Sequence, residues 1–333
     1  MTNKKYGNIW SATFNGIKDL FKKSPRIGRL ADDLRLDGKV CMVTGANSGL
    51  GFAVATQLAQ RGAHVIMACR SGIPESGEKV KALSQSDKVE MLPVDLSDLE
   101  SVHRLCNTLK EHKIKLDLLV SNAAIVPRKS RKTVQGLEEM FQVNYLAKFV
   151  MINRLLEDGT IPKNPEENSG QISRIIFVSS ETHRSAPDFN FAEFGKYQEY
   201  TMAKTVSLYG YYKLMTNTFL QELSARLNTG GEVKVSVHSL CPGPVNSNIA
   251  REAPKIFHPL IKLIFGLFFS SPTKAAEPVL YLAAAPELEK KTDVYLHLMT
   301  QKSVDERAKN PEIRAQLWKE SLKLLQGLKQ KIH

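Results

Sequence analysis

Short apolar runs alternate with amphipathic helical segments along most of the chain, and this rhythm constrains the fold more than any other feature. Six runs have the length and composition of buried strands: residues 40–43, 64–69, 89–94, 116–121, 174–180 and 233–240. Buried strands that alternate with helices are typical of a parallel sheet covered on both faces. The sequence therefore predicts one doubly wound α/β domain over residues 37–300.

Segments of a different character flank this predicted domain. Residues 1–36 form a basic leader, in which apolar residues at helical spacing are accompanied by lysines. Such a helix either lies on a membrane surface or packs on its own domain, and the sequence leaves both open. Residues 301–333 are predicted to be a helical tail packed on the domain. Its helix is expected from Pro311 to about Gln326, with Asn310 as the N-cap and Gly327 as the stop.

The charge and the cysteines limit the partners and the compartment. A formal net charge of +12 is compatible with nucleic acid, anionic lipid or a polyanionic cofactor. Nucleic acid is not expected, because the densest basic cluster, residues 128–132, has no interleaved aromatic residues. The cysteines show neither C-x-x-C nor metal-ligand spacing, so we expect no metal and a reducing compartment, cytoplasmic or on a cytoplasm-facing membrane surface rather than secreted. These cysteines are Cys41, Cys69, Cys106 and Cys241.

A glycine-rich stretch, TGANSGLG at residues 44–51, follows the first apolar run and opens a helical segment. Glycines let the backbone turn sharply and approach a pyrophosphate, and the next helix offers free N–H groups at its N-terminus. The stretch predicts a dinucleotide site that includes Gly45, Asn47, Ser48, Gly49, Leu50 and Gly51. At the end of the second run, where NAD binders place a carboxylate, the chain has Arg70, and a guanidinium favours the 2′-phosphate of NADP(H).

Together with a serine and a Y-x-x-x-K pattern further along, these motifs resemble the short-chain dehydrogenase/reductase family. The resemblance covers about residues 37–325 and implies a Rossmann-type sheet. It assigns further cofactor contacts to Asp95, Leu96, Asn122, Ala123, Ala124, Pro242, Gly243, Val245 and Ser247. Ala124 and Ser247 depart from the family pattern, which has glycine and threonine at these positions.

Two Y-x-x-x-K patterns compete for the catalytic role, Tyr200 with Lys204 and Tyr209 with Lys213. Nine residues at ~100° each would place the tyrosines on opposite faces of one helix, so only one can face a given cleft. Residues 209–227 resemble the retinol dehydrogenase branch around its catalytic lysine, whereas nothing comparable follows Lys204. We therefore predict the second pair.

The chemistry expected of this pair is proton transfer to a carbonyl oxygen. A lysine ammonium one turn away, together with the positive nicotinamide, is expected to lower the pKa of the Tyr209 phenol towards neutrality. Lys213 and Tyr209 would also contact the cofactor. The family resemblance adds Ser180 as the hydroxyl that orients the carbonyl, and Asn144 as the residue that holds a water of the proton relay.

The substrate side is predicted from an apolar lid over about residues 250–272. Such a lid favours a hydrophobic aldehyde, ketone or alcohol of retinal, lipid or steroid type. Together with the leader it also favours peripheral membrane contact. The alternative is that this segment forms an ordinary buried helix. Two other functions stay open: a double-bond reductase like the light-dependent protochlorophyllide reductase, and a non-catalytic NADPH-binding sensor or scaffold. Pro244 stands where that reductase family has a cysteine. A homo-oligomer also stays open.

Overall fold

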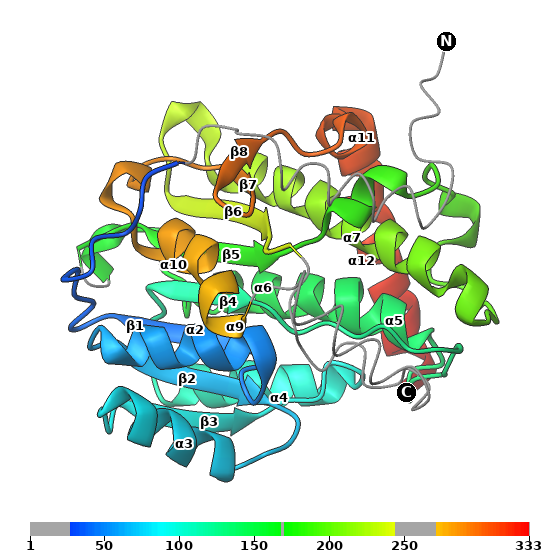
Figure 1. The fold of residues 1–333 in the computed structure, drawn as a ribbon. Helices are drawn as coiled ribbons and strands as arrows, with labels where there is room; N and C mark the ends of the chain where they lie inside the picture. The colour runs from blue at the N-terminus through cyan, green and yellow to red at the C-terminus, as the bar shows by residue number, and fades with distance from the viewer. Residues whose placement is uncertain (1–26, 168–169, 244–270, 333) are drawn as a thin grey trace.

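The computed structural model of the protein describes residues 27–167, 170–243 and 271–332. Its centre is an eight-stranded sheet in the order β3-β2-β1-β4-β5-β6-β7-β8 (Figure 1). The strands are β1 (Val40–Thr44), β2 (His64–Cys69), β3 (Val89–Pro93), β4 (Leu118–Ser121), β5 (Ser173–Val178), β6 (Val235–Cys241), β7 (Tyr295–His297) and β8 (Thr300–Lys302). The six predicted runs all form strands, and these pair in parallel.

Helices cover both faces of the sheet (Figure 1). On one face lie α2 (Gly49–Gln60), α3 (Glu75–Ser84), α9 (Pro272–Ala275) and α10 (Glu277–Ala284). On the other lie α4 (Leu99–Glu111), the π-helical turn η1 (Gln142–Leu146), α6 (Ala147–Glu157), α7 (Met202–Leu227) and α12 (Pro311–Ile332). The short elements are α5 (Glu139–Phe141), α11 (Glu306–Lys309) and the 3-10 turns η2 (Pro165–Glu167), η3 (Glu181–Ser185), η4 (Phe191–Glu193), η5 (Thr229–Gly231) and η8 (Pro286–Leu288).

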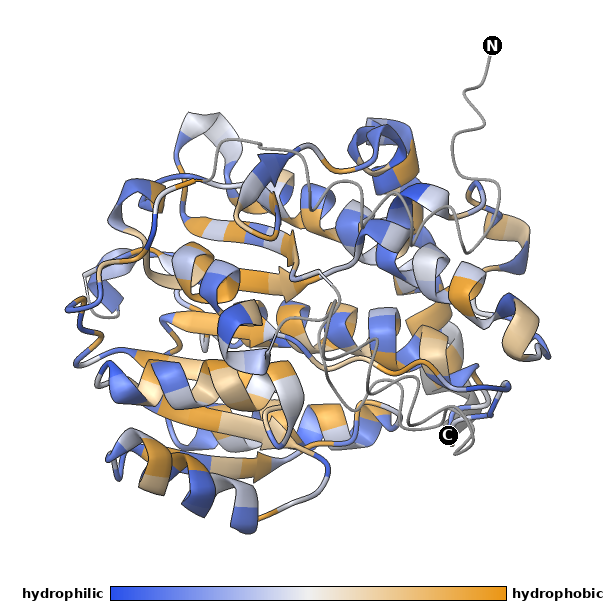
Figure 2. Cartoon of the chain, viewed as in Figure 1, coloured by the Kyte–Doolittle hydropathy of each residue, from blue (hydrophilic) through white to orange (hydrophobic). Residues whose placement is uncertain are grey.

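The central strands are mostly apolar because both of their faces are buried. In β1, Cys41 and Val43 pack on the α2 side, whereas Met42 packs on the α4 and α6 side. Figure 2 shows the same pattern as mostly hydrophobic colouring along the central strands and polar colouring on much of the outer surface of the helices. The predicted doubly wound architecture is confirmed.

The edge of the sheet differs from the prediction. Strands β7 and β8 were not expected, and β8 runs antiparallel to β7. The three residues of β8 also span the predicted domain boundary at residue 300, so the sheet continues into the predicted tail. These strands are too short to produce a recognisable apolar run.

The tail helix begins as predicted and ends later. The Asn310 side chain accepts hydrogen bonds from the backbone N–H groups of Glu312 and Ile313, at 2.9 and 3.1 Å, and so caps α12. The prediction that Gly327 ends the helix is wrong, since α12 continues to Ile332. A glycine ends a helix when it adopts a left-handed conformation, and Gly327 does not.

Several predicted features lie outside the described residues. These are most of the leader, the lid up to residue 270, and the proposed cofactor contacts Val245 and Ser247. Within the ranges that the structure covers, no helix is long and apolar enough to cross a membrane.

Candidate active site

A cavity of about 440 Å³ opens at the carboxyl ends of the parallel strands. The order of the sheet reverses between β1 and β4, which is where doubly wound folds bind their ligands. Sixteen of the predicted cofactor residues line this one cavity: Gly45, Asn47, Ser48, Gly49, Leu50, Gly51, Arg70, Asp95, Leu96, Asn122, Ala123, Ala124, Tyr209, Lys213, Pro242 and Gly243. Residues from the first strand to the sixth therefore converge on one site.

The glycine-rich turn has the geometry of an anion cradle. Gly45 and Gly49 have φ angles of +65° and +55°, which side chains other than glycine rarely adopt. A Cβ on Gly51 would lie 2.4 Å from the carbonyl oxygen of Gly45, so the turn closes only with glycine there. Ser48 occupies the N-cap position of α2 but makes no side-chain capping bond, which leaves the first N–H groups of the helix available for a phosphate.

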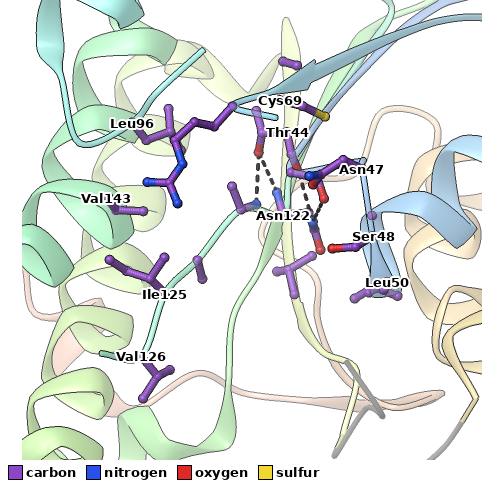
Figure 3. Close-up of a pocket in the computed structure, with 18 of the residues that line it drawn as sticks. Thr44, Asn47, Ser48, Leu50, Cys69, Leu96, Asn122, Ile125, Val126 and Val143 are labelled. Atoms are coloured by element: carbon purple, nitrogen blue, oxygen red, sulfur yellow. Dashed lines mark hydrogen bonds between the residues drawn. The ribbon is translucent and has the colours of Figure 1, made fainter. Parts of the chain in front are cut away.

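Thr44 and Asn122 hold this turn against the end of β4 (Figure 3). The Asn122 amide donates to the carbonyl oxygens of Thr44 and Gly45 at 2.9 and 3.3 Å, and the Thr44 hydroxyl accepts from the N–H groups of Asn122 and Ala123. The Asn122 side chain thus supports the cradle, in addition to lining the cavity. The importance of Thr44 was not predicted, although it precedes the first glycine of the motif.

Alanine at position 124, where the family pattern has glycine, causes no backbone strain. The residues other than glycine with positive φ in the described chain are Gln85, Lys113, Lys290, Asp293 and Leu298. Ala124 adopts an ordinary conformation, so glycine is not needed at this position.

Arg70 and Asp95 lie together at the β2 and β3 side of the cavity. The guanidinium Nη1 is 3.7 Å from the carboxylate Oδ2 of Asp95, and the arginine side chain is 51% exposed. No carboxylate stands at the end of β2 itself, where the strand ends at Cys69. The arginine is therefore accessible to an anionic group on a bound nucleotide.

The two tyrosine–lysine pairs have different surroundings. Tyr209 and Lys213 both line the cavity, and the lysine Nζ lies 5.4 Å from the centre of the tyrosine ring. The prediction that both tyrosines lie on one helix is wrong, because α7 begins at Met202 and Tyr200 precedes it. The Tyr200 hydroxyl donates to the buried carboxylate of Glu138 at 2.9 Å, away from the cavity.

Burial dominates the acid–base properties of the Tyr209–Lys213 pair. It lowers the pKa of the Lys213 ammonium to about 8, although the nearby Cys241 acts to raise it. Burial also raises the pKa of the Tyr209 phenol above its ordinary value, as does Cys241. The predicted lowering depends on the positive nicotinamide as well as on the lysine, and it stays a prediction. The Lys213 ammonium donates to the carbonyl oxygen of Val178 at 2.6 Å.

Ser180 lies two residues after the end of β5 and lines the same cavity as the pair. Its hydroxyl oxygen accepts hydrogen bonds from the backbone N–H and the hydroxyl of Thr182, at 3.3 and 3.0 Å. The hydroxyl proton of Ser180 is thus free to be donated to a substrate oxygen.

Asn144 lies behind the cavity and does not line it. Its side-chain amide makes two hydrogen bonds of 2.9 Å with the backbone of Ile125. The backbone carbonyl oxygen of Asn144 accepts a hydrogen bond from the Thr216 hydroxyl at 3.0 Å. It sits in the π-helical turn η1, a distortion that is frequent at functional sites. The residue ties the loop after β4 to α7.

Comparisons with known proteins agree with this geometry. A family model described as short chain dehydrogenase matches residues 39–192. Retinol dehydrogenase 14 of Homo sapiens is 32% identical over 332 residues, which cover 94% of this chain and 93% of that protein. The chain belongs to the short-chain dehydrogenase family. It is an oxidoreductase acting on CH–OH or C=O groups, and the inferred resemblance to the retinol dehydrogenase branch is confirmed.

Other relatives share the family and the fold. Polyprenol dehydrogenase of Homo sapiens is 31% identical over 288 residues, which cover 86% of this chain and 84% of that protein. A solved structure of an uncharacterised protein from Mycobacterium paratuberculosis superposes with a TM-score of 0.65 at 28% identity, over 89% of this chain and 97% of that one. The family uses NAD(H) or NADP(H).

Proposed function

We propose that this protein interconverts a hydrophobic aldehyde or ketone and its alcohol, with NADP(H) as the hydride carrier. One observation carries the proposal: the glycine-rich turn and the side chains of Ser180, Tyr209 and Lys213 line a single cavity. A cavity of about 440 Å³ lies in the range of about 300–1,000 Å³ that small-molecule sites occupy.

Each residue has a defined part in the proposed reaction. The bound cofactor supplies the hydride in reduction and accepts it in oxidation. Tyr209 gives its phenolic proton to the carbonyl oxygen during reduction and takes it back during oxidation. Lys213 stabilises the phenolate and contacts the cofactor, Ser180 orients the carbonyl oxygen by a hydrogen bond, and Asn144 anchors the relay that returns the proton.

Arg70 supports the choice of NADP(H). Its guanidinium is half exposed at the β2 side of the cavity, and a guanidinium binds a phosphate through two parallel hydrogen bonds. An Arg70→Ala variant should lose most of its preference for NADPH over NADH, which competition titrations of the two cofactors would measure. An unchanged preference would argue against this role.

A hydrophobic substrate is supported by the apolar side chains of Ile125, Val126 and Val143 in the cavity lining. Relatives named retinol dehydrogenase and polyprenol dehydrogenase point to the same class. Peripheral membrane contact through the leader and the lid would bring such a substrate to the site. Deletion of residues 1–35 should then release the protein from liposomes, and unchanged binding would contradict that role.

The deciding experiment follows NADPH oxidation in the dark with all-trans-retinal, a medium-chain aldehyde and a ketosteroid. Wild type should turn over at least one of them, Tyr209→Phe should be inactive, and Tyr200→Phe is the matched control that should keep its turnover. NADPH binding without turnover of any carbonyl would favour a sensor or scaffold instead. Undiminished turnover by Tyr209→Phe would refute the assignment of the acid/base.

A further inference from the structure

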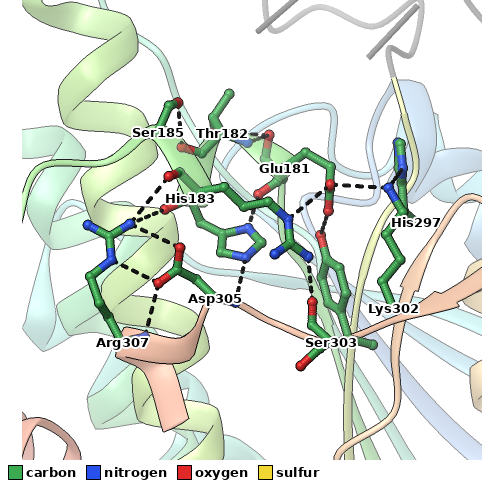
Figure 4. Close-up of polar contacts among 12 residues, drawn as sticks. Glu181, Thr182, His183, Ser185, His297, Lys302, Ser303, Asp305 and Arg307 are labelled. Carbon is green, nitrogen blue, oxygen red and sulfur yellow. Dashed lines mark hydrogen bonds and ion pairs between the residues drawn. The ribbon is translucent and has the colours of Figure 1, made fainter. Parts of the chain in front are cut away.

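The short helix η3 begins directly after Ser180 and determines where its hydroxyl lies. Thr182, in the first turn of η3, makes both hydrogen bonds to the Ser180 hydroxyl oxygen. Any displacement of η3 therefore moves or releases this oxygen. Figure 4 shows η3 next to the C-terminal segment 295–307, which is defined here as the chain from β7 to α11.

His183 links the backbone of Ser180 to this segment. Its ring is fully buried; Nδ1 lies 2.6 Å from the Ser180 carbonyl oxygen, and Nε2 lies 3.2 Å from the backbone nitrogen of Asp305. A backbone N–H can only donate, so Nε2 must be the unprotonated acceptor and Nδ1–H must donate to Ser180. The imidazole is held neutral in one tautomer, in agreement with burial lowering its pKa to about 4.

Arg307 fixes the other end of η3. Its guanidinium donates to the carbonyl oxygens of Ala186, His183 and Arg184, at 2.7, 3.3 and 3.4 Å. The same guanidinium is held by both carboxylate oxygens of Asp305, at 2.8 and 3.1 Å. Carbonyl groups at the end of a helix lack intrahelical partners, and Arg307 supplies donors to three of the carbonyl groups at this end.

Glu181 attaches the first residue of η3 to the same segment. Its carboxylate accepts from the Tyr295 hydroxyl at 2.5 Å and pairs with Lys302 at 3.5 Å, while Arg184 donates to it from within η3 at 3.1 Å. Burial acts to raise the pKa of this carboxyl, but the Tyr295 bond and the neighbouring cations outweigh it and lower the pKa to about 2. The carboxylate therefore stays charged across the physiological range.

We propose that His183 is a positioning residue for the Ser180 hydroxyl, acting through the hydrogen bond from its Nδ1–H to the Ser180 carbonyl oxygen. The inference rests on the proposed role of Ser180 in orienting a carbonyl. The contact is made to the backbone of Ser180 and leaves its hydroxyl proton for the substrate. The segment 295–307 does not line the cavity and supports η3 from outside it through Glu181 and Arg307.

Two variants of His183 separate the two ring contacts. Asparagine can place an amide N–H near the position of Nδ1, whereas glutamine reaches the position of Nε2 and leaves the Ser180 carbonyl without its donor. We expect His183→Asn to keep kcat within about threefold of wild type and His183→Gln to lose about tenfold to a hundredfold, since small misplacements of catalytic groups have effects of this size. KM for NADPH should be unchanged in both, because the glycine-rich turn is not touched.

His238 is the matched control. It is also a buried histidine, in β6, and its Nδ1 accepts from the backbone N–H of Val294 at 3.3 Å. His238→Asn should lower Tm while leaving kcat near wild type. A loss of kcat in this control that matches the loss in His183→Gln would overturn the proposal, because it would show a general effect of instability.

A second measurement does not depend on turnover. Amide hydrogen exchange across residues 179–186 should be faster in His183→Gln than in His183→Asn, since Thr182 loses its fixed partner. If wild type reduces no carbonyl, the proposed function fails, and this exchange still reports whether His183 fixes the turn. Equal exchange and equal kcat in the two variants would overturn the positioning role.

Discussion

Replacing Gly210 with alanine would test how closely η3 must approach α7. Gly210 lies inside α7, next to Tyr209, and a Cβ built on it would be 2.6 Å from the carbonyl oxygen of Thr182. Contacts of Cβ atoms below 3.0 Å essentially do not occur, so η3 and α7 must separate by roughly half an ångström (a small shift of a packed backbone). The separation would move Ser180 relative to Tyr209.

The expected effects on stability and on turnover differ in size. Alanine is favoured over glycine inside a helix by about 1 kcal/mol, whereas overpacking costs about 1–3 kcal/mol, so the net loss of stability should be about 2 kcal/mol or less. Turnover should fall about tenfold or more, because a misplacement of about 1 Å can cost a hundredfold. Activity would thus suffer far more than folding.

Steady-state kinetics and chemical denaturation of Gly210→Ala would measure both quantities. Gly327→Ala is the matched control, since Gly327 also lies inside a helix but a Cβ placed on it would meet nothing within 4 Å. The control should gain up to about 1 kcal/mol of stability and keep its kcat. Wild-type kcat in Gly210→Ala would refute the reasoning that this glycine sets the distance between the two catalytic side chains.

Three further predictions concern buried groups. Lys148 is 1% exposed, and its side-chain nitrogen has no hydrogen-bond partner among the described residues. Lys148→Met should therefore stabilise the protein by about 1–3 kcal/mol in denaturant titrations at pH 7, and a loss of stability would show an unrecognised partner. Burial holds the pKa of His183 at about 4 against an ordinary 6.5, so the unfolded chain gains a proton first as the pH falls. Stability should therefore decrease between pH 6.5 and 4 by up to about 3 kcal/mol, and His183→Asn should show a shallower decrease; identical pH curves would contradict this. Gly51→Ala should weaken NADPH binding by tenfold or more in fluorescence titrations, because its Cβ would lie 2.4 Å from the Gly45 carbonyl oxygen; unchanged affinity would mean that the turn can widen.

Much of the fold and the cofactor side of the site could be predicted, because both depend on local patterns. Apolar runs bounded by helical periodicity identify buried strands, and a glycine-rich turn after the first strand identifies the phosphate cradle. Even the Asn310 cap of α12 follows from residue type and position alone. The choice of Tyr209 over Tyr200 rested on resemblance to a family branch, since the two patterns are equivalent in spacing.

The sequence by itself determined which elements form and which residues end the parallel strands, because propensity, periodicity and turn chemistry act over a few neighbouring residues. Only the tertiary structure showed that Tyr200 bonds Glu138 outside the cavity, that Asn122 supports the turn, and that β8 pairs antiparallel at the edge. The link from Asp305 through His183 to Ser180 joins residues more than 120 positions apart. Such contacts exist only once the chain has packed, since the hydrogen-bond partners of a buried polar group depend on which distant segments the fold brings beside it.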